Sequence, residues 1–310
     1  MPHITASLVK KLREQTGAGM MDCKRALTEV GGNIDPAIDW LRKKGLAAAA
    51  KKAGRVASEG LIAVSTGDLV GAVVEVNSET DFVARNEEFQ KFARNVANLA
   101  IEVDGDLDNL KGSEFSGAGV TVAEESIAMV GRIGENIVLR RSCALGVEVG
   151  VVASYIHNSV GEGLGKIGVL VGLESSGDPK ILNKLGRKIA MHVCAARPES
   201  IDRDGLDPSL LRRERDVLVE QAKNSGKSSE IIEKMVEGRL RKFYEEVVLG
   251  EQIYVIDGEN KVDKVIEVAS KEINAPIRVS GFMRFELGEG IEKHGEDFAA
   301  EVAAQIASEG

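Results

Sequence analysis

The sequence is short of aromatic residues and cysteines, and it has no long apolar run. Aromatics make up 4% of its 310 residues, so aliphatic side chains must fill the core, and an exposed aromatic ring would be notable. The cysteines Cys23, Cys143 and Cys194 are odd in number and far apart, which excludes a disulfide framework and a short-spaced zinc knuckle. No run of about 18 apolar residues and no amino-terminal signal or Arg-rich extension occurs. We therefore expect a cytoplasmic protein without a membrane segment.

An excess of positive charge is missing as well. The net charge is -9 and the pI is about 5.2, whereas binding through nucleic-acid phosphates needs a strongly basic surface. We expect no direct nucleic-acid partner.

The residues of a catalytic or metal site are also lacking. The four histidines have no metal-ligand spacing, and no serine or cysteine lies in a recognised nucleophile motif; the histidines are His3, His157, His192 and His294. His192 falls within an expected helix, where a structural role is favoured. The sequence thus predicts no covalent catalysis, no cofactor and no metal.

Two glycine-containing runs resemble phosphate-binding motifs only in part. Gly163-Leu-Gly165-Lys-Ile-Gly168 has dinucleotide-motif spacing, but strands flank it and no helix follows, so a hairpin turn is expected. Gly226-Lys227-Ser228 lacks the first glycine of a phosphate-binding loop and follows a helix, so it also predicts a turn.

What is present indicates a soluble α+β protein of more than one domain. Hydrophobic residues make up 43% and charged residues 29% of the chain, and its length exceeds that of a typical single domain. Helical spacing and glycine stops predict an amino-terminal three-helix module and then a helical linker; the ranges are Ala6–Gln15, Met20–Val30, Asp35–Gly45 and the linker Leu46–Ala57.

A strand hairpin followed by a helix occurs twice. The first copy is Gly60–Ser65, Gly71–Asn77 and Glu87–Ile101, and the second is Gly150–His157, Gly168–Glu174 and Pro179–Cys194. A further strand is expected after each copy, at Asn136–Ser142 and Tyr244–Leu249. The pattern predicts a duplicated α+β core.

Two more helical segments complete the organisation. Ser209–Lys223 and Ser229–Tyr244 predict an antiparallel helical hairpin inserted in the second copy, and Glu292–Ala307 predicts a carboxy-terminal helix. The expected domains are residues 1–57, 58–143, 144–195 with 239–290, the insert 196–238, and 291–310.

The segment from Asn77 to Phe89, between a strand and a helix, is the most informative part of the sequence. Local chemistry favours Thr80 or Asp81 as the helix N-cap and Phe82 as a hydrophobic staple. A second interpretation follows from motifs along the whole chain.

These motifs closely resemble the bacterial elongation factor Ts family. They comprise the segment 77–89, Thr-Gly-Ala-Gly-Met-Met-Asp-Cys-Lys at 16–24, Ile-Gly-Glu-Asn-Ile at 133–137, Ile-Ala-Met-His-Val at 189–193 and Gly-Phe-Met-Arg-Phe-Glu-Leu-Gly-Glu-Gly-Ile-Glu-Lys at 281–293. The resemblance implies a ubiquitin-associated-like amino-terminal module, a two-part α+β core, a dimerisation hairpin and a carboxy-terminal helix.

The resemblance also implies guanine-nucleotide exchange on elongation factor Tu, by displacement of magnesium and release of GDP before GTP loading. The residues matching the magnesium-dislodging segment are Thr80, Asp81, Phe82 and Val83, with Phe82 as the wedge. Further partner contacts implied by the family are Arg13, Met20, Met21, Lys24, Ile133, Gly134, Asn136 and His157, with core packing an equal alternative for Met20 and Met21. The resemblance is also compatible with a homodimer or with a two-to-two complex with elongation factor Tu.

Two other classes of function stay open at this point. The chain could be an adaptor or chaperone whose amino-terminal module binds another protein, or a small-molecule enzyme. The enzyme is disfavoured because no cluster of acid, base, nucleophile or metal ligands is found.

Overall fold

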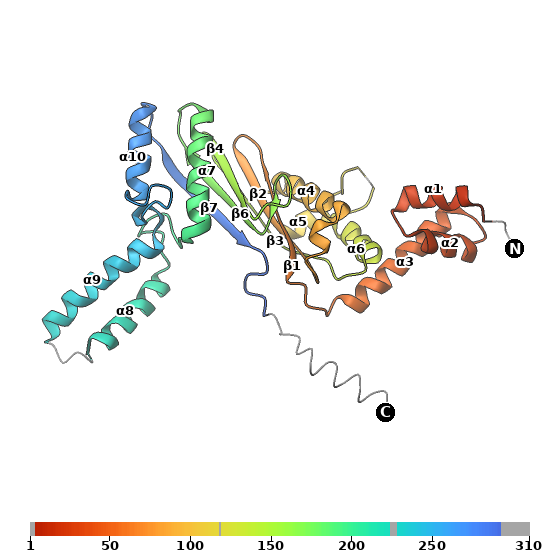
Figure 1. Ribbon diagram of the computed structural model, residues 1–310, viewed down its shortest axis with the longest axis horizontal. Coiled ribbons are helices and arrows are strands. Elements are labelled where there is room, and N and C mark those ends of the chain that lie inside the picture. Colours follow the sequence, from red (N-terminus) through yellow and green to blue (C-terminus); the bar gives the residue numbers. More distant parts are fainter. Residues whose placement is uncertain (1–3, 118, 224–227, 293–310) are drawn as a thin grey trace.

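The structure is a mixed α+β fold built around two antiparallel sheets, as the composition and patterning predict. The computed structural model describes residues 4–117, 119–223 and 228–292. Figure 1 shows a three-helix unit on one side of the sheets and a helical hairpin on the other. No helix in these ranges has the length and apolar character needed to span a bilayer. The predicted carboxy-terminal helix lies outside them apart from Glu292, as do Gly226 and Lys227 of the predicted turn.

The amino-terminal unit consists of α1 (Ala6–Thr16), α2 (Met20–Glu29) and α3 (Ile34–Lys52). At the start of α1 the Thr5 hydroxyl accepts a hydrogen bond from the Leu8 amide at 3.2 Å, and Gly17 ends the helix in the left-handed conformation. The three helices enclose a small core of their own, formed by Val9, Leu12, Cys23, Ala26, Leu27 and Ala37. The resemblance to a ubiquitin-associated module stays a prediction.

The predicted helix end at Gly45 is wrong, because α3 continues without a break to Lys52. Gly45 lies where α3 crosses α6 (Val122–Ile133), and a Cβ placed on Gly131 would lie 3.3 Å from the Gly45 Cα. Small residues permit this close helix crossing. Glycine at position 45 therefore serves packing, and residues 46–52 of the expected linker continue the same helix.

The first sheet has the strand order β3-β2-β1-β5. Its members are β1 (Glu59–Thr66), β2 (Val70–Ser78), β3 (Val138–Gly146) and β5 (Leu164–Gly165). One face is covered by α4 (Glu87–Glu102), with α5 (Leu107–Gly112) and α6 beside it. β3 begins two residues later than expected, and the short strand β5 was not predicted.

The second sheet has the order β4-β6-β7 and repeats the arrangement of the first. Its strands are β4 (Gly150–His157), β6 (Ile167–Glu174) and β7 (Arg278–Glu286), and the helices beside it are α7 (Pro179–Ala196) and α10 (Val262–Glu272). In each half a hairpin is followed by helices and by a third strand that pairs with the second strand of the hairpin. The central strands β2 and β6 each carry a register shift toward that third strand.

The strand predicted at Tyr244–Leu249 is wrong. The hairpin helices are α8 (Pro208–Lys223) and α9 (Ser229–Val247), and a 3-10 turn, η2 (Leu249–Glu251), follows α9. Tyr244 and Val247 fit helical spacing, and the Arg203 guanidinium lies 4.3 Å from the centre of the Tyr244 ring. The strand that corresponds to β3 is β7, because α10, and not α9, holds the position of α6.

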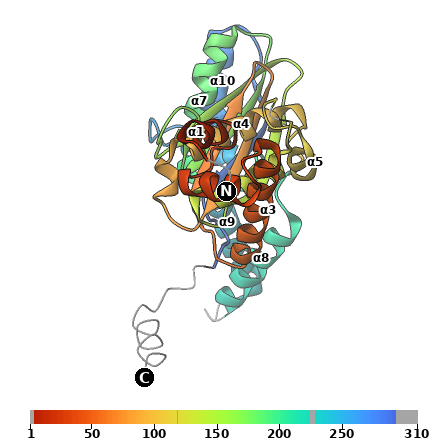
Figure 2. The same cartoon turned by 90° about the vertical axis from the view of Figure 1, so that its right-hand side faces the viewer.

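The two sheets pack face to face, and Figure 2 views this arrangement from the side of the three-helix unit. Ile62 and Val73 of the first sheet meet Val152 and Leu170 of the second in one buried cluster. A Cβ on Gly168 would lie only 2.6 Å from the Ile62 Cγ2, so glycine is needed for this close approach. The result is a sandwich with α4 outside one sheet and α7 outside the other.

A buried carboxylate joins the first sheet to the segment after β7. Glu75 of β2 has no exposed surface, and it accepts hydrogen bonds from Arg140 at 3.0 Å, from Arg141, and from the Gly288 amide at 2.8 Å. Its charge is therefore matched by two guanidinium groups and one backbone donor. This network fixes the end of the described chain against β2 and β3.

Candidate functional site

The loop between β2 and α4 leaves one large aromatic side chain in solvent. Phe82 is 77% exposed, whereas Phe89, seven positions along the chain, has no exposed surface. A 3-10 turn, η1 (Val83–Arg85), follows Phe82, and both Val83 and Ala84 are buried in the core of the first sheet. The buried side chain of Val83 thus anchors the loop to the core while the ring of Phe82 lies in solvent.

The predicted helix cap in this loop is wrong. Asn86 is the N-cap of α4, since its Oδ1 accepts hydrogen bonds from the Glu88 amide at 2.8 Å and the Phe89 amide at 3.2 Å. Thr80 and Asp81 therefore have no capping role. Phe82 makes no hydrophobic staple, because its ring is exposed. The local alternative to a partner-binding role is removed.

The structure brings the segment 79–83 into contact with the predicted second contact loop, residues 133–136. Thr80 donates from its backbone amide and its hydroxyl to the Glu135 carboxylate, at 2.9 Å and 2.6 Å. Glu135 was not among the predicted site residues. The signal in the sequence was its position inside the Ile-Gly-Glu-Asn-Ile motif, although nothing in that motif names its partner.

Residues of the second loop differ in what they offer to a partner. Gly134 is exposed and ends α6 in the left-handed conformation, with φ at 88°. Ile133 packs against the core of the first sheet. Asn136 is 6% exposed, and its side-chain amide donates to the Arg55 carbonyl at 2.9 Å. In the free protein, Gly134 is the member of this set that a partner could reach directly.

The predicted contacts in the amino-terminal unit lie on its surface. Met20 is 48% exposed and Met21 is 76% exposed, and Arg13 and Lys24 are exposed as well. The opposite face of α2 supplies the buried residues of this unit. The core-packing alternative for the two methionines is therefore wrong.

The turn between α1 and α2 lies against the same end of the first sheet's helical layer. A Cβ on Gly17 would be 3.0 Å from the Arg132 Cδ and 3.5 Å from a Glu88 carboxylate oxygen. Arg132, near the end of α6, forms ion pairs with Glu88 at the start of α4 and with Glu125 at 2.5 Å. The start of α4, which follows the Phe82 loop, is thus also the point that the amino-terminal unit touches.

His157 lies apart from these groups, at the end of β4. It is exposed, and its Nδ1 is 3.2 Å from the Tyr155 hydroxyl. The connection that follows crosses to the first sheet, where β5 pairs with β1 at Ile62 and Ala63. Gly163 and Gly165 belong to this crossing, and β6 begins directly afterwards, so the absence of a helix after this motif is confirmed.

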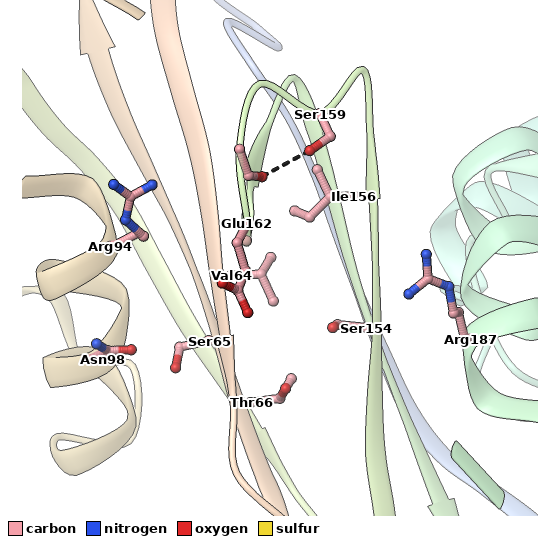
Figure 3. A pocket seen from close by; sticks show the side chains of 12 residues that line it. Val64, Ser65, Thr66, Arg94, Asn98, Ser154, Ile156, Ser159, Glu162 and Arg187 are labelled. Carbon is pink, nitrogen blue, oxygen red and sulfur yellow. Dashed lines mark hydrogen bonds between the residues drawn. The ribbon is translucent and has the colours of Figure 1, made fainter. Parts of the chain in front are cut away.

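A polar cavity of about 600 Å³ opens near this crossing (Figure 3). Arg94 of α4 and Arg187 of α7 flank it from opposite sides, and Glu162 and Ser154 lie between them. The Ser159 hydroxyl donates to the Gly161 carbonyl at 2.8 Å. None of the predicted site residues lines this cavity.

Groups suited to covalent or metal chemistry do not gather among the described residues. No three His, Cys, Asp or Glu side chains there are placed to hold a metal ion. Burial raises the pKa of Cys23, Cys143 and Cys194, which keeps these thiols protonated and weakly nucleophilic.

His192, expected to be structural, is fully buried in α7. Burial lowers its pKa, and its Nε2 lies 2.9 Å from the Gln252 side-chain oxygen while its Nδ1 accepts from the Val255 amide at 3.2 Å. Tyr254 beside it is buried, and burial raises its pKa to about 12. Its hydroxyl finds no hydrogen-bond partner within the described ranges. This cluster holds α7 to the segment after η2.

Comparison with known proteins gives one consistent family. The family model described as "Elongation factor TS" matches residues 79–289. The Elongation factor Ts of Rhodospirillum rubrum is 63% identical over 307 residues, which cover 99% of each chain. Those of Rhodospirillum centenum and Parvibaculum lavamentivorans are 59% identical over 304 residues, covering 98% of this chain and 99% of each relative. The similarity spans the Phe82 loop, the Glu135 loop and both sheets.

Proposed function

The chain belongs to the elongation factor Ts family, a family of translation elongation factors, and from this premise we propose that it is a guanine-nucleotide exchange factor for elongation factor Tu. The observation that supports this function is the exposed ring of Phe82, anchored through its buried neighbour Val83. Among the exposed large hydrophobic side chains of the described residues, Phe82 is the aromatic one, so its ring offers a large apolar surface that a partner can bury.

The proposed action of Phe82 is mechanical. The ring enters a gap between elements of the GTPase that hold the magnesium ion, and it fits only when these elements separate. Magnesium bridges GDP phosphate oxygens to the GTPase, so its displacement removes much of the affinity for GDP. Burying the exposed ring supplies about 2 kcal/mol toward this rearrangement. Asp81 is exposed beside it, and we assign to it a supporting hydrogen bond to the displaced element.

Nucleotide and exchange factor weaken each other's binding by the same factor, as linkage requires. The factor thus expels GDP, and incoming GTP expels the factor. The rate of exchange rises while the overall equilibrium is unchanged. No bond is made or broken by this chain, so we propose that it acts without a cofactor and without covalent chemistry.

Further partner contacts are proposed on the exposed residues of the amino-terminal unit and at Gly134. The exposed methionines Met20 and Met21 offer flexible apolar side chains, which suit a protein interface. Arg13 and Lys24 supply positive charge beside them. His157 is proposed as a separate contact, since it lies at the end of β4.

Self-association is proposed through the α8–α9 hairpin. Leu218, Ala222 and Val236 are buried between its helices, while Val217 and Ile231 remain 46% and 49% exposed. Static light scattering of the wild type and Ile231→Lys tests it: a dimer that becomes a monomer in the variant supports this role, and a monomeric wild type contradicts it.

The exchange function is tested by mixing the purified chain with elongation factor Tu that carries fluorescent GDP. Stopped-flow traces should show GDP release that accelerates with the concentration of the chain. Unchanged release together with stable binding to the GTPase would favour an adaptor. Unchanged release without binding would remove elongation factor Tu as the partner.

A further inference from the structure

Two loops of the candidate site hold each other through a reciprocal pair of carboxylates. Glu135, in the loop after α6, accepts from the Thr80 amide and hydroxyl. Glu79, in the loop after β2, accepts from the Asn136 amide at 2.6 Å. Each loop thus contributes a carboxylate that satisfies a backbone donor of the other loop. We name this pair of contacts the clasp, and we propose that Glu135 and Glu79 are positioning residues that fix the direction of the Phe82 ring.

The strength of the clasp follows from its chemistry. Both oxygens of Glu135 are used on one residue, with the 2.6 Å contact from the Thr80 hydroxyl and the 2.9 Å contact from its amide. Hydrogen bonds to an ionised carboxylate are shorter and stronger than neutral ones. Thr80 and Glu135 are both half-buried, so water competes less for these contacts than it would at an open surface.

The place of the clasp in the loop gives it a function. Thr80 is fixed two residues before Phe82, and Val83, directly after Phe82, is buried in the core. Asp81 and Phe82 are therefore the exposed residues between two anchors. A side chain whose backbone is already fixed loses less conformational entropy when it binds. Without Glu135 the Thr80 carbonyl still accepts from the Ser78 hydroxyl at 2.9 Å, but the Thr80 amide and hydroxyl lose their partner. The ring would then sample directions that do not fit the partner.

A third segment joins the clasp. Arg55, which follows α3, lies 3.4 Å from the second oxygen of Glu79, and its carbonyl accepts from the Asn136 side chain at 2.9 Å. Lys52, the last residue of α3, donates to the Gly134 carbonyl. The end of the amino-terminal unit is thus held at the same junction as the Phe82 loop.

This inference rests on the proposed exchange function, and its main test separates an indirect role from a direct one. Glu135→Ala should slow the GDP release that the chain promotes by roughly 10-fold, because two charge-assisted hydrogen bonds that orient the ring are lost, and by no more than the roughly 30-fold expected when the ring itself is removed. In a Phe82→Ala background the same change should have almost no further effect, because Glu135 acts through the ring. Glu135→Gln keeps one acceptor oxygen, so the rate of GDP release that it promotes should lie between those of Glu135→Ala and wild type. Glu102→Ala, at the exposed far end of α4, is the matched control and should match wild type.

A second measurement needs no partner. Amide hydrogen exchange should accelerate at Thr80 in Glu135→Ala and at Asn136 in Glu79→Ala, while the amides of α4 stay protected as in wild type. This crossed pattern is specific to the reciprocal contacts. General loosening of the fold would instead raise exchange throughout α4.

The outcomes are distinct. If Glu135→Ala accelerated GDP release from elongation factor Tu as well as wild type does, the inference would be overturned. It would also be overturned if Glu135→Ala reduced the rate of GDP release by the same factor with and without the Phe82 ring, because that result would indicate direct contact of Glu135 with the partner. Unchanged protection of Thr80 in Glu135→Ala would also overturn it. A wild-type chain that does not accelerate GDP release would instead contradict the proposed function, while the amide measurement would still decide whether the clasp orders the loop.

Discussion

Phe82 and Phe89 form a matched pair for separating function from stability. Both are phenylalanines of the same segment, yet one is 77% exposed and the other has no exposed surface. Full burial of a phenylalanine side chain contributes about 1.5–3 kcal/mol, so the fraction of Phe82 that is covered in the free protein is worth at most roughly 0.7 kcal/mol. Phe82→Ala should therefore change the free energy of unfolding by no more than about that amount.

Phe82→Ala should, in contrast, strongly slow the GDP release that the chain promotes. Loss of about 2 kcal/mol of ring burial in the exchange complex corresponds to GDP release that is roughly 30-fold slower. Phe89→Ala should show the opposite pattern, with unfolding free energy lowered by about 3–5 kcal/mol because it leaves a cavity in the core. Urea denaturation measures the first quantity, and stopped-flow release of fluorescent GDP from elongation factor Tu measures the second.

The reasoning has a clear point of failure. If Phe82→Ala promoted GDP release from elongation factor Tu at the wild-type rate, the ring would not be the wedge. If it lowered stability as much as Phe89→Ala, the ring would belong to the core and the exposed placement of Phe82 would have no functional meaning.

Three further predictions concern stability. Tyr254→Phe removes a buried hydroxyl without a hydrogen-bond partner in the described part of the chain, so thermal unfolding should show stability unchanged or raised by up to about 1 kcal/mol, and a clear loss would reveal a missed contact. Burial lowers the pKa of His192, so the unfolded chain binds a proton at higher pH than the folded chain does, and the free energy of unfolding should fall as the pH drops below the unfolded pKa of about 6.5. His192→Asn should make the free energy of unfolding less dependent on pH between about pH 7.5 and 5.5. If the variant kept the wild-type dependence, other groups would cause the loss of stability. Glu75→Gln removes the buried negative charge that pairs with the partly exposed guanidinium of Arg140, and urea denaturation should show the free energy of unfolding lowered by about 2–3 kcal/mol. A decrease below about 0.5 kcal/mol would mean that water replaces the carboxylate.

The helices and most strands were predictable because their signals are local. Asp178 and Pro179 mark the start of α7, and helical spacing of apolar residues marks α4. Local signals failed where tertiary packing changed their meaning. Gly45 looked like a helix end, but it permits the crossing with α6. Tyr244 looked like part of a strand, but it continues α9.

The site was predictable only in part. The family resemblance named Phe82 as the wedge but left open whether the ring is exposed in the free protein, and local chemistry favoured a staple. Glu135 was missed because its partner Thr80 is 55 positions away, and no spacing rule joins two loops across a sheet. Glu79 was missed for the same reason, and both carboxylates adjoin residues that the motifs had already singled out.

The unbroken course of α3 has a consequence for how the two proposed contact surfaces, at Met21 and at Phe82, act together. A single helix runs from the core of the amino-terminal unit, across α6, to the junction beside Phe82, so the spacing between Met21 and Phe82 is set before any partner arrives. Once one surface has bound, the other is presented at a high effective concentration, and its binding becomes an intramolecular step. Insertion of a short glycine-rich stretch at Gly45 would lower that effective concentration while leaving each surface chemically intact.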